Sequence, residues 1–135
     1  MTFSENIKTV CVIDDDKIYV YGLKKLISIK QLCPNLIEFE NGKLAIDFLA
    51  NPENQATLPD IIFLDINMPV MDGWDFMDNY VKIKPQLGKK ITVYMISSSI
   101  SNEDIDRAKS ISDVSDYLIK PVSPNKLIEL FNMAA

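Results

Sequence analysis

Acidic, hydroxyl and amino side chains each follow directly on a short apolar run of this chain. They are two neighbouring aspartates, a third aspartate, a serine and a lysine: Asp14, Asp15, Asp65, Ser97 and Lys120. If the runs are parallel strands of one sheet, these side chains meet at its carboxyl edge, where open α/β sheets bind ligands. Three carboxylates, a hydroxyl and an ammonium together suit a site that holds a divalent cation and accepts a phosphoryl group.

The elements that must position these side chains alternate along the chain. The expected strands cover residues 8–14, 35–40, 60–65, 91–97 and 116–120, and the expected helices cover 16–30, 42–51, 73–84, 101–112 and 124–134. Most of these strands are continuously apolar, as expected where helices cover both faces of a parallel sheet. The pattern predicts a three-layer, doubly wound (βα)₅ fold of the α/β class with right-handed crossovers.

Length and composition indicate how many domains the chain has and which partners and locations it excludes. With 135 residues, 47% of them apolar, we expect one domain over 1–135, its core in about 7–134, and no output domain. A net charge of −5 argues against a nucleic-acid-binding surface, and no apolar run approaches the roughly 20 residues of a membrane span. Cys11 and Cys33 have no zinc or redox spacing, and no signal peptide is apparent, so we expect a cytoplasmic protein.

The stretch 65–73, which reads DINMPVMDG, resembles the D-x-x-M-P-x-M-D-G stretch of the receiver domain of two-component response regulators. Four other positions match that family in order and spacing: the acidic pair Asp14-Asp15, Ser97, the switching aromatic Tyr117 and Lys120-Pro121. The resemblance covers nearly the entire chain. It implies a flavodoxin-like fold whose five-stranded parallel sheet has the strand order 2-1-3-4-5.

The resemblance also implies a metal site and a phosphoacceptor. Asp65 would accept the phosphoryl group. Asp15, Asp65 and the backbone carbonyl of Asn67 would bind Mg²⁺ directly, and Asp14 would act on the metal mainly through water. The residue types agree, because Mg²⁺ prefers oxygen ligands and neighbouring carboxylates repel one another unless a cation is present.

The remaining residues of the resemblance would carry the signal. Lys120 would pair with the carboxylates and then with the phosphoryl oxygens, while Ser97 would donate a hydrogen bond to the phosphoryl group. Tyr117 would then turn inward and change the face made by the fourth helix, fifth strand and fifth helix. Asn67 and Ser99 fall where the family tunes the access of hydrolytic water.

By this resemblance the chain is a stand-alone response regulator rather than a turnover enzyme. Its donor would be a histidine kinase or histidine phosphotransfer protein, and its output an unidentified protein partner. A monomer or weak dimer is expected. Ile18 and Tyr21 lie beside the acidic pair and off the apolar stripe of the first helix, so they either dock the donor or are covered by neighbouring loops.

Plainer interpretations of the same residues stand beside these. The run Asp14-Asp15-Asp16 could be an acidic turn that caps the first helix, and Asp16 is expected to do only this. Ser97 begins a serine run that could be merely polar, and Ser98 and Ser99 stay unassigned in this interpretation. Lys120 could be exposed, and Tyr117 could be ordinary core.

Three other functions fit parts of the sequence. Asp14-x-Asp16 superficially matches the D-x-D of haloacid dehalogenase-type phosphatases, but Lys17-Ile18 departs from that family's pattern. A nucleotide-binding module is weakly supported. The chain has four glycines, and they form neither of the glycine-rich phosphate-binding motifs, GxGxxG and GxxxxGK(S/T). A receiver fold that acts as a phosphorylation-independent interaction module remains open.

Overall fold

Five parallel strands form one sheet in the order β2-β1-β3-β4-β5. The structure is a computed structural model that describes residues 7–134. Its elements are β1 (Thr9–Ile13), α1 (Lys17–Ile29), β2 (Asn35–Phe39), α2 (Gly42–Ala50), η1 (Pro52–Thr57), β3 (Ile61–Leu64), α3 (Gly73–Leu87), β4 (Thr92–Ser97), α4 (Asn102–Lys109), β5 (Val114–Ile119) and α5 (Pro124–Ala134). The predicted doubly wound, flavodoxin-like fold and its strand order are confirmed.

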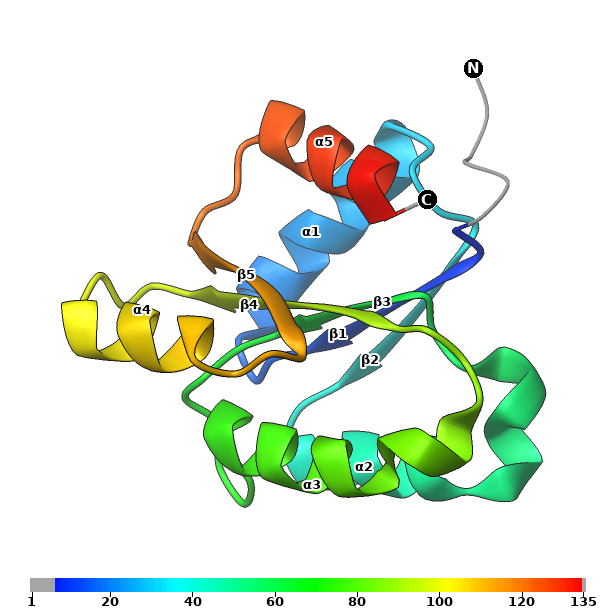
Figure 1. Ribbon diagram of the computed structural model, residues 1–135. Helices are drawn as coiled ribbons and strands as arrows, with labels where there is room; N and C mark the ends of the chain where they lie inside the picture. Colours follow the sequence, from blue (N-terminus) through cyan, green and yellow to red (C-terminus); the bar gives the residue numbers. More distant parts are fainter. Residues whose placement is uncertain (1–6, 135) are drawn as a thin grey trace.

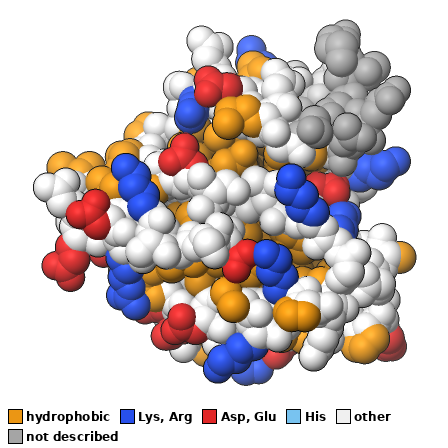
Figure 2. All heavy atoms as spheres, viewed as in Figure 1, with side chains coloured by type: hydrophobic (Ala, Val, Ile, Leu, Met, Phe, Trp, Pro, Cys, Tyr) orange, Lys and Arg blue, Asp and Glu red, His pale blue; other side chains and the backbone are white. Residues whose placement is uncertain are grey.

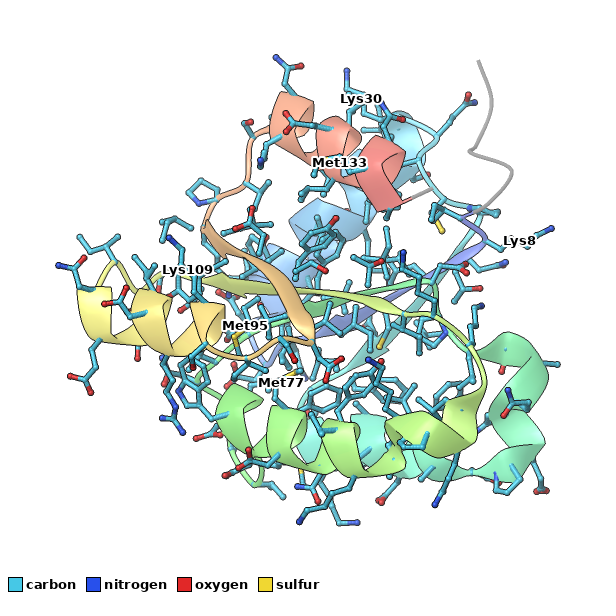
Figure 3. The ribbon with its side chains drawn as sticks, viewed as in Figure 1. Lys8, Lys30, Met77, Met95, Lys109 and Met133 are labelled. Atoms are coloured by element: carbon cyan, nitrogen blue, oxygen red, sulfur yellow. The ribbon has the colours of Figure 1, made fainter. Side chains whose placement is uncertain are left out.

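Helices cover both faces of the sheet, and a core layer lies beneath each set. Helices α1 and α5 lie on one face, with α2, α3 and α4 on the other (Figure 1). Met95 of β4 and Met77 of α3 fill the layer between the sheet and α3 (Figure 3). Helix α5 buries three apolar side chains fully in the opposite layer: Leu127, Leu130 and Phe131.

Polar side chains cap the N-termini of α1 and α5 close to the ends of the preceding strands. Asp16 accepts hydrogen bonds from two backbone N–H groups of the first turn of α1, each at 3.1 Å. Ser123 caps α5 by accepting from the N–H of Lys126 at 3.1 Å, and Pro124 follows at the first helical position. The short connections keep the first turns of these helices next to the carboxyl edge of the sheet.

The ends of α3 and α4 and the segment after α2 differ most from the prediction. Helix α3 continues past Pro85 and ends at Leu87. The next residue, Gly88, caps the helix in the left-handed conformation, with a φ of +64°. The buried side chain of Leu87 explains why the last turn persists despite the proline. Helix α4 ends at Lys109 rather than at 112, because the hydroxyl of Ser110 donates to the carbonyl of Arg107 and closes the turn. The loop predicted after α2 contains the 3₁₀ helix η1.

Charged side chains of both signs lie on the surface, and the two cysteines lie inside. On the face shown in Figure 2, lysine and arginine side chains lie among aspartate and glutamate side chains. Both Cys11 and Cys33 are buried and unpaired. Within residues 7–134, none of the helices has the length and apolar character that crossing a membrane would require.

Candidate functional site

Backbone pairing places the predicted site residues at one edge of the sheet. The N–H of Asp65 donates to the carbonyl of Ile13 at 2.9 Å, directly before Asp14. On the neighbouring pair of strands, the N–H of Lys120 donates to the carbonyl of Ser97, also at 2.9 Å. The sheet therefore brings together residues that lie far apart in the sequence, as their positions at strand ends predicted.

Three carboxylates form the centre of this edge. One oxygen from each of Asp14, Asp15 and Asp65 lies within 4.8 Å of the other two. Asp14 and Asp65 are buried, whereas Asp15 is exposed. Backbone N–H groups fix the two buried carboxylates: Asp16 donates to Oδ1 of Asp14 and Ile66 donates to Oδ1 of Asp65, each at 2.9 Å.

Lys120 reaches into the cluster from the end of β5. Its Nζ lies 2.7 Å from Oδ2 of Asp14 and 3.7 Å from Oδ2 of Asp65, with only 14% of the side chain exposed. The same Nζ lies 4.4 Å from the ring centroid of Tyr19, within range of a cation–π contact. The peptide bond between Lys120 and Pro121 is cis. Lys120 is therefore part of the cluster and not the exposed lysine of the plainer interpretation.

The surroundings of Asp65 oppose its ionisation. Burial, followed by the neighbouring charge of Asp14, raises the pKa of Asp65 to about 6, although Lys120 and the N–H of Ile66 act in the opposite direction. A divalent cation among these oxygens would relieve the repulsion. Asp14, Asp15 and Asp65 offer the hard oxygen ligands that Mg²⁺ prefers, and Asn67 lies on the same loop, two residues after Asp65. The donor set thus fits Mg²⁺.

Ser97 at the end of β4 and Tyr117 in β5 both bond to Ser99, which lies in the loop after β4. Ser97 is buried, and its Oγ accepts a hydrogen bond from the N–H of Ser99 at 3.1 Å. Because that oxygen acts as acceptor there, the hydroxyl hydrogen can donate to another group. Tyr117 is also buried, and its hydroxyl donates to the carbonyl of Ser99 at 2.8 Å.

Asp16 does not join the carboxylate cluster. Its exposed side chain caps α1, as the sequence predicted, so the Asp14-x-Asp16 pattern supplies no second catalytic acid. This geometry removes the main support for the dehalogenase-type interpretation.

Two contributors to the site were missed in the sequence. Tyr19 has the spacing of a core residue in the first helix, yet its ring also packs against the ammonium of Lys120. Gly73 begins α3 against the backbone of Asp65: a Cβ added at Gly73 would lie 2.4 Å from the carbonyl oxygen of Asp65. Its place at the end of the 65–73 stretch was the one available signal.

An open parallel sheet that presents a carboxylate cluster, a lysine and a buried hydroxyl at its carboxyl edge defines a receiver-type signalling domain. A family model, described as the response regulator receiver domain, matches residues 10–132. The chain belongs to the response regulator receiver domain family.

Known relatives agree with this assignment. The nitrate/nitrite response regulator protein NarL of Escherichia coli is 31% identical over 129 residues, which cover 94% of this chain and 54% of NarL. The chain thus spans about half the length of this relative. The chemotaxis protein CheY of Thermotoga maritima is 27% identical, and the match covers 93% of this chain and 95% of CheY.

Solved structures show the same architecture. A two-component response regulator from Cytophaga hutchinsonii is 30% identical, with a TM-score of 0.85, and the match covers 95% of this chain and 96% of that one. Receiver domains are signalling domains of two-component systems that take phosphoryl groups from histidine kinases and bind Mg²⁺ at an acidic pocket. The cluster Asp14, Asp15 and Asp65 provides such a pocket here.

Proposed function

We propose that this chain is a response regulator that accepts a phosphoryl group on Asp65 and passes the signal to a protein partner by a conformational change. The observation that carries the proposal is the contact of Lys120 with both Asp14 and Asp65 in a cluster of three carboxylates. A phosphorylation-independent module would not require a buried aspartate whose ionisation is opposed by its surroundings.

The chemistry follows from the fixed positions of the side chains. A carboxylate oxygen of Asp65 attacks the phosphorus of a phosphohistidine, the P–N bond breaks, and the histidine imidazole leaves with a proton from solvent. Lys120 faces the developing charge on the phosphoryl oxygens, and the Ser97 hydroxyl donates to one of them. Mg²⁺ held by Asp14, Asp15, Asp65 and the carbonyl of Asn67 would supply further positive charge.

Phosphorylation then alters the balance of two conformations. The added charge, about −1.5 to −2 by analogy with phosphoserine, draws Ser97 towards the phosphoryl group. Tyr117 bonds to the same loop, so its inward position is favoured together with that of Ser97. The face of α4, β5 and α5 is thereby presented to the output partner as a shift in population.

The first experiment is incubation with acetyl phosphate, with and without Mg²⁺, followed by intact mass and fluorescence. We expect a Mg²⁺-dependent phosphoryl adduct that is absent in Asp65→Asn. Trp74, the chain's only tryptophan, should report the change because Arg107 of α4 lies 4.4 Å from its ring centroid. If a phosphohistidine donor also yields no adduct and Mg²⁺ leaves the fluorescence unchanged, the phosphorylation-independent module is the better interpretation.

Exposed apolar side chains around the cluster suit donor docking. Ile18 is 87% exposed and Tyr21 62% exposed at the start of α1, so neighbouring loops do not cover them. Val70 is also exposed, and its φ of +69° is strained for a β-branched residue. Such a rim around a charged centre is typical of a protein interface.

Ile18→Ser and Tyr21→Ser should slow phosphoryl transfer from the phosphohistidine domain of a kinase that phosphorylates the wild type, by about tenfold each. Transfer from acetyl phosphate, which needs no docking, should be unchanged. Ile29→Ser is the matched control, because Ile29 is also largely exposed, at 71%, but lies at the far end of α1. Equal rates for Ile18→Ser and Ile29→Ser would exclude docking through this rim.

A further inference from the structure

One serine in the β4–α4 loop binds three parts of the molecule at once. The N–H of Ser99 donates to Oγ of Ser97 at 3.1 Å, and its carbonyl accepts from the hydroxyl of Tyr117 at 2.8 Å. Its own hydroxyl donates to Oδ2 of Asp104 at 2.7 Å and accepts from the N–H of Ser101 at 3.3 Å. Ser99 therefore joins the site serine, strand β5 and the first turn of α4.

The side-chain bonds of Ser99 modify the cap of α4. Ser101 caps the helix by accepting from the N–H of Asp104 at 3.1 Å. In an ordinary capping box, an acidic side chain at the third helical position would accept from the N–H of the cap residue. Here the hydroxyl of Ser99 stands between Ser101 and Asp104 and completes the box. The cap of α4 is thus built through a residue that is itself bonded to Ser97.

Few other contacts hold α4 in place. It has eight residues, of which only Ala108 is buried, and Ile105 is half-buried against the same core layer. Arg107 adds the contact with Trp74 of α3. A short helix with so little buried apolar surface depends strongly on its cap, so a displacement of Ser99 will move or loosen its first turn.

We propose that Ser99 is a positioning residue that transmits the position of Ser97 to the first turn of α4 through Asp104. The inference rests on the proposed function, since phosphorylation of Asp65 is what would draw Ser97 into a new position. A Ser97 hydroxyl that donates to a phosphoryl oxygen becomes a better acceptor for the N–H of Ser99, because hydrogen bonds in a chain polarise one another. When Ser97 moves, its bond to the N–H of Ser99 draws the β4–α4 loop with it, and the bond from the Ser99 hydroxyl moves Asp104 in turn.

The test compares backbone amide NMR shifts of Asp104 and Ile105 before and after addition of acetyl phosphate and Mg²⁺, normalised to the adduct fraction from intact mass. Wild type should show a shift change that Ser99→Ala reduces several-fold, and Ser99→Thr, which keeps a hydroxyl, should restore it. Ser98→Ala is the matched control, because Ser98 is the exposed neighbour in the same serine run. An unchanged response in Ser99→Ala would overturn the inference.

A second arm needs no phosphorylation and separates the two proposals. In the untreated protein, Ser97→Ala removes the acceptor of the Ser99 N–H and should shift the amides of Asp104 and Ile105. In a Ser99→Ala background, the same change should have little further effect, because the link to Asp104 is already broken. Additive shifts would overturn the inference, whereas absence of an adduct in the wild type would count against the proposed function alone.

Discussion

Asp65→Asn should make the Mg²⁺-free protein more stable at neutral pH, by about 2 kcal/mol, while abolishing phosphoryl acceptance. Asp65 is buried beside Asp14, and both causes raise its pKa to about 6. A free aspartate in an unfolded chain has a pKa of about 3.9, so the full difference corresponds to about 3 kcal/mol. Solvent screening at this partly open site lowers the expected effect to about 2 kcal/mol. Asparagine has a similar shape but no charge, so it removes the repulsion.

The sign of the pH dependence follows from linkage. The folded protein binds a proton at Asp65 more tightly than the unfolded chain does, so the carboxyl favours folding most when both states are protonated. That contribution is lost as the pH rises from about 4 to about 6. The gap between Asp65→Asn and the wild type should therefore be small near pH 4 and reach its full size near pH 7.

Urea unfolding in EDTA across this pH range measures the effect, with Asp78→Asn on the exposed face of α3 as the control. Added Mg²⁺ should stabilise the wild type by mass action and Asp65→Asn much less, because one of the proposed ligands is gone. A variant that is less stable than the wild type at neutral pH without Mg²⁺ would show that Lys120 already compensates the cluster fully.

The fold and the location of the site could be predicted because both depend on local pattern and on one geometric rule. Apolar runs gave the strands, and parallel strands place their carboxyl ends together, so Asp14, Asp65, Ser97 and Lys120 had to meet. The end of α4 was harder to predict from the sequence, because the Ser110–Ile111–Ser112 segment fits a helix or a turn equally well. In the structure the hydroxyl of Ser110 donates to the carbonyl of Arg107, and this bond ends the helix at Lys109.

The contributors that were missed depend on contacts between distant segments. A tyrosine at position 19 has the spacing of a core residue, and only the arrival of Lys120 from β5 shows that its ring also faces a cation. The sequence connected Ser99 only with the access of hydrolytic water, because its partners Asp104 and Tyr117 lie on other elements. The chemical roles of the site residues stay predictions until phosphorylation is measured.

Gly73→Ala should both destabilise the protein and displace the phosphoacceptor. A Cβ at Gly73 would lie 2.4 Å from the carbonyl oxygen of Asp65 and 2.9 Å from the Cα of Ile66, so the backbone must shift. The N–H of Gly73 also donates to the carbonyl of Ile66 at 2.7 Å, which ties α3 to the same segment. We expect a loss of about 3 kcal/mol in the free energy of unfolding.

The same shift should also impair function, because it moves the phosphoacceptor itself. A displacement of about 1 Å at a reacting group can lower a rate by roughly a hundredfold, so phosphorylation by acetyl phosphate should slow at least tenfold even where the variant is folded. Circular dichroism at the temperature of the assay establishes that Gly73→Ala is folded, and intact mass over time gives the rate.

Gly22→Ala is the matched control, with the opposite expected sign. Gly22 lies on the exposed side of α1, and a Cβ there would meet nothing within 4 Å. Alanine is favoured over glycine in a helix by about 1 kcal/mol, so this variant should be more stable than the wild type and phosphorylated at the same rate. If the two variants behave alike, α3 does not pack against the phosphoacceptor as the structure has it, and the position of Asp65 must depend on β3 alone.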